Sequence, residues 1–187
     1  MGEGDIARAI ANARSYLTAN PAEARYRDAP ATATIEDGLR VRVTGTDGSA
    51  LVTDMVTGVG GGGSAPSPGW MFRAAYASCA ATLIAMRAAE EGWALSALDV
   101  TVDSESDDRG ILGLSPNVPA GPLSVRVAVR ASVPGVDADV IRAAIQAAIA
   151  RCPVHDAVAR PVPIEIDRKS TRLNSSHRSV SRMPSSA

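Results

Sequence analysis

The feature that most constrains the fold is a long helical segment with no charged residue through its middle. Ser67 provides a helix cap and is followed by proline at the first helical position. The pattern predicts a helix over 68–91 that ends at Gly92, and its stretch 74–86 is free of charge. Since such a helix presents little polar surface to water, we expect it to be buried nearly all round.

Alternating apolar and polar residues predict strands on both sides of this helix. Before it, the pattern and the turn signals predict an antiparallel meander, and after it they predict further strands and a second helix. The order of elements predicts an α+β fold in which helices pack on antiparallel sheet. The predicted strands are 31–35, 39–43, 50–56, 98–102, 123–133 and 161–166, and the other predicted helices are 5–17 and 137–152, the last ended by Pro153.

The bulk composition narrows the classes of function. The apolar content of 45% is enough for a core, and 3% aromatic residues means that Ala, Val, Ile and Leu build it. A net charge of −1 offers no basic surface for nucleic acid or anionic membrane. The charge-free stretch is too short to span a bilayer, and the first residues lack the apolar core of a signal peptide. We therefore expect a cytoplasmic protein without nucleic-acid or membrane partners.

The chain divides into three parts. Residues 1–30 are expected to form an N-terminal helix and a connector, and residues 31–167 the main domain. Residues 168–187 are rich in Ser and Arg, lack periodicity and are predicted to be disordered, with the character of a non-native, translated linker. Within the main domain, the glycine-rich segment 58–67 is expected to be the most flexible stretch.

The two cysteines are the residues with the most chemical potential. Cys79 lies within the central helix, and Cys152 completes the apolar stripe of the second helix. One interpretation is that both are small apolar residues of the core, where burial raises the pKa of a thiol and makes it inert. The other is that the fold brings them together as a dithiol that closes to a disulfide. The residues alone leave both interpretations open.

Other motifs predict no further chemistry. Cys152 and His155 have a loose metal-ligand spacing without a second ligand pair, so we expect no metal site. The run 60–63 lacks the Lys-Ser/Thr of a phosphate-binding loop. His155 is the one histidine before the tail, and no Ser-His-Asp order supports hydrolysis.

The segment PSPGWMFRAAYASCAATLIAMRAAEEG, followed by strands and a helix ending in RCPVHDAV, resembles the OsmC/Ohr superfamily of bacterial thiol peroxidases. The resemblance runs from about 31 to 166, so it makes 31–167 an OsmC-like domain. It implies an intertwined homodimer in which curved antiparallel sheets wrap two long central helices. It also implies that Cys79 is the peroxidatic thiol and Cys152 the resolving thiol, with an organic peroxide as substrate. An external dithiol would be the reductant, and no cofactor (metal, haem or flavin) would be needed.

The resemblance further implies partners for the thiol. A substrate would approach Cys79 over apolar side chains, and an arginine from the N-terminal strands would stabilise the thiolate. The candidates for that arginine are Arg40 and Arg42. The candidates for the substrate pocket are Trp70, Phe72, Tyr76, Leu83 and Met86.

One departure from the family pattern supports an alternative function. Active members carry a glutamate ten residues before the first cysteine, where it helps to hold the arginine, whereas this chain has Gly69. Without that carboxylate the thiol would be less activated. The alternative is therefore a catalytically weak or inactive dimer that binds a small hydrophobic ligand.

Overall fold

One long helix organises the chain, and the computed structural model describes residues 2–167 around it. Helix α2 spans Pro68–Glu90, as the sequence predicted. The Ser67 side chain accepts a hydrogen bond from the backbone N–H of Trp70 at 3.2 Å, which satisfies one of the free donors of the first turn. The predicted tail, 168–187, lies outside the described residues.

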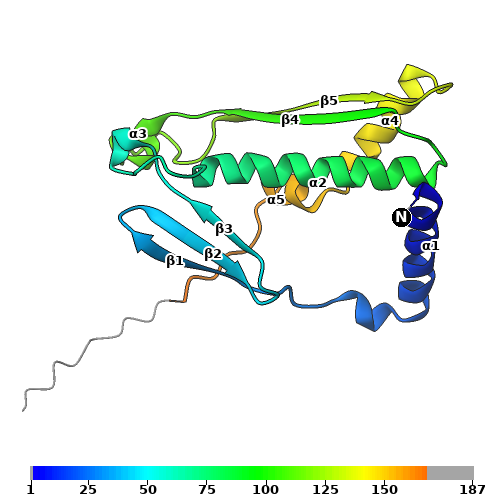
Figure 1. Cartoon of the computed structure of the whole chain (residues 1–187), viewed down its shortest axis with the longest axis horizontal. Helices are drawn as coiled ribbons and strands as arrows, with labels where there is room; N and C mark the ends of the chain where they lie inside the picture. Colours follow the sequence, from blue (N-terminus) through cyan, green and yellow to red (C-terminus); the bar gives the residue numbers. More distant parts are fainter. Residues whose placement is uncertain (1, 168–187) are drawn as a thin grey trace, which may run out of the picture.

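A two-stranded antiparallel sheet runs along one side of α2 (Figure 1). It consists of β4 (Ala97–Glu105) and β5 (Ser124–Ser132), with Val102 paired to Val127. Alternate residues of β5 are half-buried, because every second side chain points to the same face of a strand. Both strands were predicted, although β4 runs three residues further than the alternation indicated, through the start of the acidic segment.

A three-stranded antiparallel sheet lies on the other side of α2 (Figure 1). Its strands are β1 (Ala31–Asp37), β2 (Arg40–Gly45) and β3 (Ala50–Thr53), in the order β1-β2-β3. This arrangement confirms the predicted meander. Every residue of β1 is exposed, so this sheet has little of the chain packed against its outer strand.

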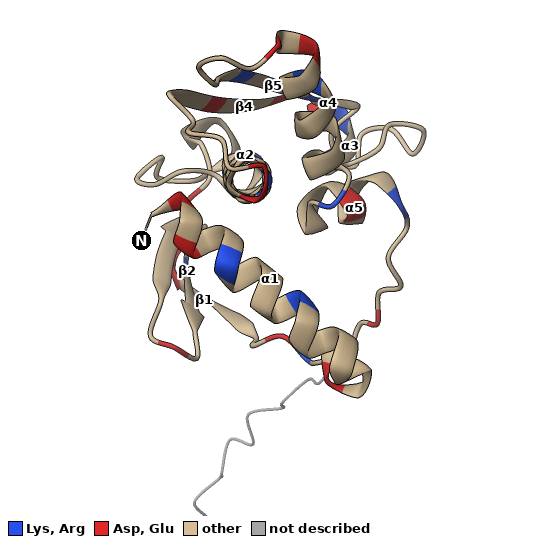
Figure 2. Cartoon of the chain, turned by 90° about the vertical axis from the view of Figure 1, so that its right-hand side faces the viewer, with Lys and Arg blue, Asp and Glu red and all other residues tan. Residues whose placement is uncertain are grey.

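The remaining helices surround α2. Figure 2 looks along α2 and shows β4 and β5 on one side of it, α1 on another, and α4 and α5 beside it. The predicted α+β class with antiparallel sheets is therefore confirmed. Each helix of residues 2–167 is too short or too polar to cross a bilayer. The bounds are α1 Glu3–Ala19, η1 Pro21–Ala24, η2 Thr57–Val59, α3 Asp108–Ile111, α4 Ala138–Ile149 and α5 Pro153–Ala159.

The expected all-round burial of α2 is wrong for the single chain. The other elements cover only part of its circumference, and a stripe formed by Ala75, Ser78 and Thr82 is exposed. These residues are three and four positions apart, so they lie on one face of the helix. The residues that are buried are Tyr76, Ala80, Ile84, Ala88 and Ala89.

The predictions for the C-terminal part need two corrections. The second helix, α4, ends at Ile149, and Cys152 is not part of it but caps a further helix, α5, which begins at Pro153. Proline suits the first position of a helix because its nitrogen has no proton to donate. The predicted strand 161–166 is also wrong: the segment has no regular structure and its residues are exposed. It alternates like a strand, but no strand of the described chain pairs with it.

Candidate dithiol site

The two cysteines, 73 residues apart in the chain, meet in the structure. The thiol of Cys152 donates a hydrogen bond to Sγ of Cys79, and the two sulfur atoms are 3.0 Å apart. Cys79 comes from the middle of α2 and is partly exposed, whereas Cys152 precedes α5 and is 0% exposed. A disulfide needs an S–S distance of about 2.05 Å, so a shift of roughly one ångström would allow the two sulfur atoms to bond.

Apolar side chains from five elements surround the dithiol. Tyr76, Ala80 and Cys152 form its buried centre. Valines from β4 and β5 cover this centre because the inner faces of both strands point towards α2. The partly buried residues packed against it are Cys79, Leu83, Val100, Val102, Val125, Val127, Ile149 and Val154.

The electrostatic environment of Cys79 favours the protonated thiol. Burial raises the pKa of Cys79, and its hydrogen bond with Cys152 raises this pKa further. The backbone N–H of Val154 acts in the opposite direction, because it donates to the sulfur and stabilises the thiolate. Among residues 2–167, no arginine side chain hydrogen-bonds to Cys79, so the thiolate has no cationic partner within the described chain.

A second polar pair lies beside the dithiol. The hydroxyl of Tyr76, whose residue is 3% exposed, is hydrogen-bonded to Nδ1 of His155, and the two ring centroids are 6.0 Å apart. Burial and, to a smaller extent, the nearby Cys152 raise the pKa of Tyr76. The sequence pattern around His155 was tested for a metal site and for a Ser-His-Asp arrangement, but not for a contact with Tyr76. Its position three residues after Cys152 was the available signal, because that spacing places both on one side of a short helix.

The predicted pocket residues do not gather in one cavity. Tyr76 and Leu83 lie in the cluster around the dithiol. Phe72 lines a pocket of about 420 Å³ at the start of α2, while Leu83 and Met86 line another of about 320 Å³ against α1 and α4. Trp70 is 49% exposed and belongs to neither pocket.

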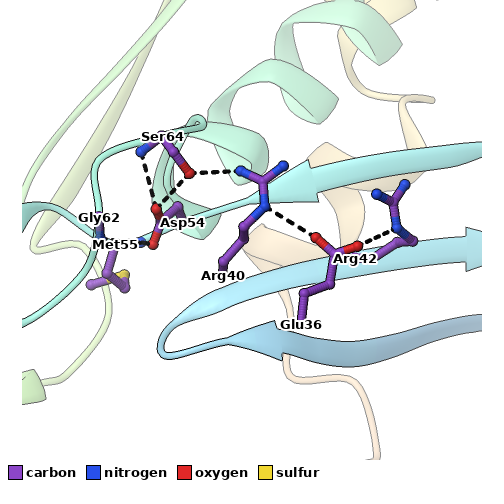
Figure 3. Close-up of polar contacts among 7 residues, drawn as sticks. All are labelled: Glu36, Arg40, Arg42, Asp54, Met55, Gly62 and Ser64. Atoms are coloured by element: carbon purple, nitrogen blue, oxygen red, sulfur yellow. Dashed lines mark hydrogen bonds and ion pairs between the residues drawn. The ribbon is translucent and has the colours of Figure 1, made fainter.

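The two candidate arginines are engaged on the three-stranded sheet (Figure 3). Nε of Arg40 donates to Glu36 at 3.0 Å, and Nε of Arg42 donates to the other carboxylate oxygen of Glu36 at 2.5 Å. These bonds lower the pKa of Glu36, with that from Arg42 contributing most. Both arginines are therefore paired with a carboxylate within their own chain.

The glycine-rich segment is anchored rather than free (Figure 3). Asp54 is 3% exposed and accepts hydrogen bonds from the backbone N–H groups of Met55, Gly62 and Ser64, and from the Ser64 hydroxyl. These bonds, the one from the Ser64 backbone above all, lower the pKa of Asp54. The Ser64 hydroxyl in turn accepts from Nη1 of Arg40 at 2.6 Å. The prediction that segment 58–67 is the most flexible stretch did not take into account its hydrogen bonds to Asp54.

These features define an α+β protein with a half-buried dithiol between a long central helix and a short C-terminal one. Residues 61–167, more than half of the chain, match the family model described as OsmC-like protein. The chain therefore belongs to the OsmC-like family, as its resemblance to the superfamily predicted. No curated protein sequence matches it.

Solved structures agree with this family and fold. An organic hydroperoxide resistance protein OsmC of Legionella pneumophila is 25% identical with a TM-score of 0.53, over 72% of this chain and 90% of that one. A putative organic hydroperoxide resistance protein of Vibrio cholerae is 25% identical with a TM-score of 0.50, over 71% and 86%. An OsmC-like protein of Mycoplasma pneumoniae is 12% identical with a TM-score of 0.61, over 72% and 89%, and shows the fold alone.

Proposed function

We propose that the protein is a cysteine-based hydroperoxide reductase that acts on organic peroxides, with Cys79 as the attacking thiol and Cys152 as the resolving thiol. The observation that carries this proposal is the 3.0 Å separation of the two sulfur atoms. It is supported by family membership and by the similar structures from Legionella pneumophila and Vibrio cholerae, whose names refer to organic hydroperoxide resistance.

The proposed reaction has two chemical steps before regeneration. The Cys79 thiolate attacks the terminal peroxide oxygen, the O–O bond breaks, and the alkoxide takes a proton and leaves as an alcohol. Cys79 is thereby oxidised to a sulfenic acid. The sulfur of Cys152 then attacks the sulfur of Cys79 and displaces the sulfenic hydroxyl group, which leaves as water after it takes the Cys152 proton. An external dithiol, of the kind that a reducing cytoplasm supplies, returns both thiols.

The proposal includes a homodimer. Two surfaces that a single chain leaves open support it: the exposed stripe of α2 and strand β1, which is exposed throughout. A helix of such low polarity and a sheet with an uncovered face are stabilised when a second copy buries them. We expect a solution mass of twice the 19.2 kDa chain mass. Light scattering on a sizing column measures this mass, and a monomer at micromolar concentration would contradict the proposal.

The test of the reductase is stoichiometric. Reduced protein, treated with one equivalent of cumene hydroperoxide, should lose both thiols within seconds, and its intact mass should fall by two hydrogen atoms. The thiolate is the reactive form, so the raised pKa of Cys79 means that this loss should be faster at pH 9 than at pH 7. Thiols that persist for many minutes at both pH values would rule the reductase out.

Two observations favour the alternative function, a dimer of little or no activity that binds a small hydrophobic ligand. The pKa of Cys79 is raised by burial, and Gly69 stands where active members have a carboxylate. The space beside Gly69 holds Nη1 of Arg73, 3.9 Å from the position that a Cβ would take. Persistent thiols in the peroxide test would support this alternative.

A further inference from the structure

Two neighbouring contacts join α2 to the start of α5. Cys79 contacts Cys152, and Tyr76 contacts His155. Tyr76 lies three residues before Cys79 on α2, and its partner His155 lies three residues after Cys152. The spacing of one helical turn is the same on both sides. A contact between Tyr76 and His155 therefore restricts the positions that Cys152 can take relative to Cys79.

The remaining ties of α5 to the molecule are few. Apart from the contacts of the two sulfur atoms, the bond between Tyr76 and His155 is the side-chain hydrogen bond that joins α2 to α5 in residues 2–167. Cys152 caps α5 without a side-chain hydrogen bond to that helix. The neighbouring charge on Asp156 is paired with Arg160 at 2.7 Å, so it does not compete for His155.

We infer that the hydrogen bond between Tyr76 and His155 is a positioning contact that holds the start of α5 against α2 and so keeps the sulfur of Cys152 within reach of the sulfur of Cys79. Tyr76 is 3% exposed, so water cannot easily replace His155 as its partner. Without this contact, Cys152 would remain in the chain but would spend less time beside Cys79. The role of this contact in peroxide turnover rests on the proposed function, whereas its effect on disulfide formation does not.

A redox titration without peroxide tests the inference. In a glutathione buffer, the two thiols and one glutathione disulfide exchange for the protein disulfide and two glutathione thiols, and intact mass gives the equilibrium constant. We expect Tyr76→Phe and His155→Ala each to lower this constant by about 3- to 10-fold, the range that one hydrogen bond contributes. The double variant should lose no more than either single variant, because both remove the same bond.

A conservative substitution separates this bond from packing. In His155→Asn the side-chain amide places a hydrogen-bonding group near the position of Nδ1, so we expect its equilibrium constant to stay within about twofold of the wild type. Tyr26→Phe is the matched control for loss of a tyrosine hydroxyl, since Tyr26 is 79% exposed and far along the chain from the dithiol. Circular dichroism verifies that each variant folds. If Tyr76→Phe does not fold, the inference is tested with His155→Ala alone.

Two results would overturn the inference. One is a wild-type constant in both Tyr76→Phe and His155→Ala. The other is a constant for His155→Asn as low as that for His155→Ala, which would assign the effect to packing of the ring. If the wild-type protein forms the disulfide in glutathione but does not react with cumene hydroperoxide, the proposed function is refuted. The redox titration still tests the positioning contact in that case. With peroxide, both Tyr76→Phe and His155→Ala should convert the sulfenic acid to the disulfide more slowly than the wild type does.

Discussion

Replacement of Cys79 by serine is expected to abolish the reduction of cumene hydroperoxide, whereas replacement of Cys152 by serine should permit one turnover for each chain. The first variant lacks the sulfur that breaks the O–O bond, and a serine hydroxyl is far less nucleophilic than a thiolate. The second variant keeps that sulfur but has no thiol within 3.0 Å to displace the sulfenic oxygen. The measurement is peroxide consumed for each chain, together with intact mass.

The two variants serve as controls for each other, because each removes one thiol from the same cluster. Cys152→Ser should gain the mass of one oxygen atom and react with a sulfenic-acid probe, and Cys79→Ser should do neither. Wild-type rates in both variants would show that the dithiol has no part in peroxide chemistry. A reactive Cys79→Ser variant would reverse the assigned roles.

The second large effect concerns the loop that Asp54 anchors. A Cβ added at Gly61 would lie 2.0 Å from the backbone oxygen of Met55, closer than any real contact. The backbone cannot yield without breaking the neighbouring hydrogen bonds to Asp54. We expect Gly61→Ala to reduce the free energy of unfolding by about 1–3 kcal/mol or more, the cost of forcing an extra methyl group into a packed site. Urea denaturation measures this difference.

The matched control is Gly58→Ala in the same segment. A Cβ there meets nothing within 4 Å, and Gly58 does not have a positive φ angle. Its free energy of unfolding should stay within about 0.5 kcal/mol of the wild type, as for most surface substitutions. Equal urea midpoints for Gly61→Ala and Gly58→Ala would mean that the loop is free to move away from Met55.

The regular elements that follow from local pattern were predictable from the sequence. Helix α2 begins where Ser67 and proline indicated, and strands β2 and β5 follow their alternation. The meeting of Cys79 and Cys152 was not predictable from spacing, because no local pattern relates residues so far apart. It came from the resemblance to a family, and the structure now supplies its geometry.

Features that depend on tertiary partners were the ones that sequence reasoning missed. Segment 161–166 alternates like a strand, but alternation cannot show whether a neighbouring strand exists to pair with it. Pro153 was interpreted as an end of a helix, although proline is equally suited to a beginning, and here it starts α5. Asp54 lay within the predicted strand 50–56, but the observed strand ends at Thr53, and the donors that Asp54 binds come from the backbone of the glycine-rich segment.

The unequal burial of the two thiols would give the regeneration step a direction. Once the pair has closed to a disulfide, an incoming reductant can approach the sulfur of Cys79, which is partly exposed, but not that of Cys152, which is 0% exposed. Attack at Cys79 makes Cys152 the leaving group and places the mixed disulfide on α2. The reductant would thus be selected by its fit to the surface around Cys79, and a bulky thiol would be excluded by shape rather than by its reduction potential.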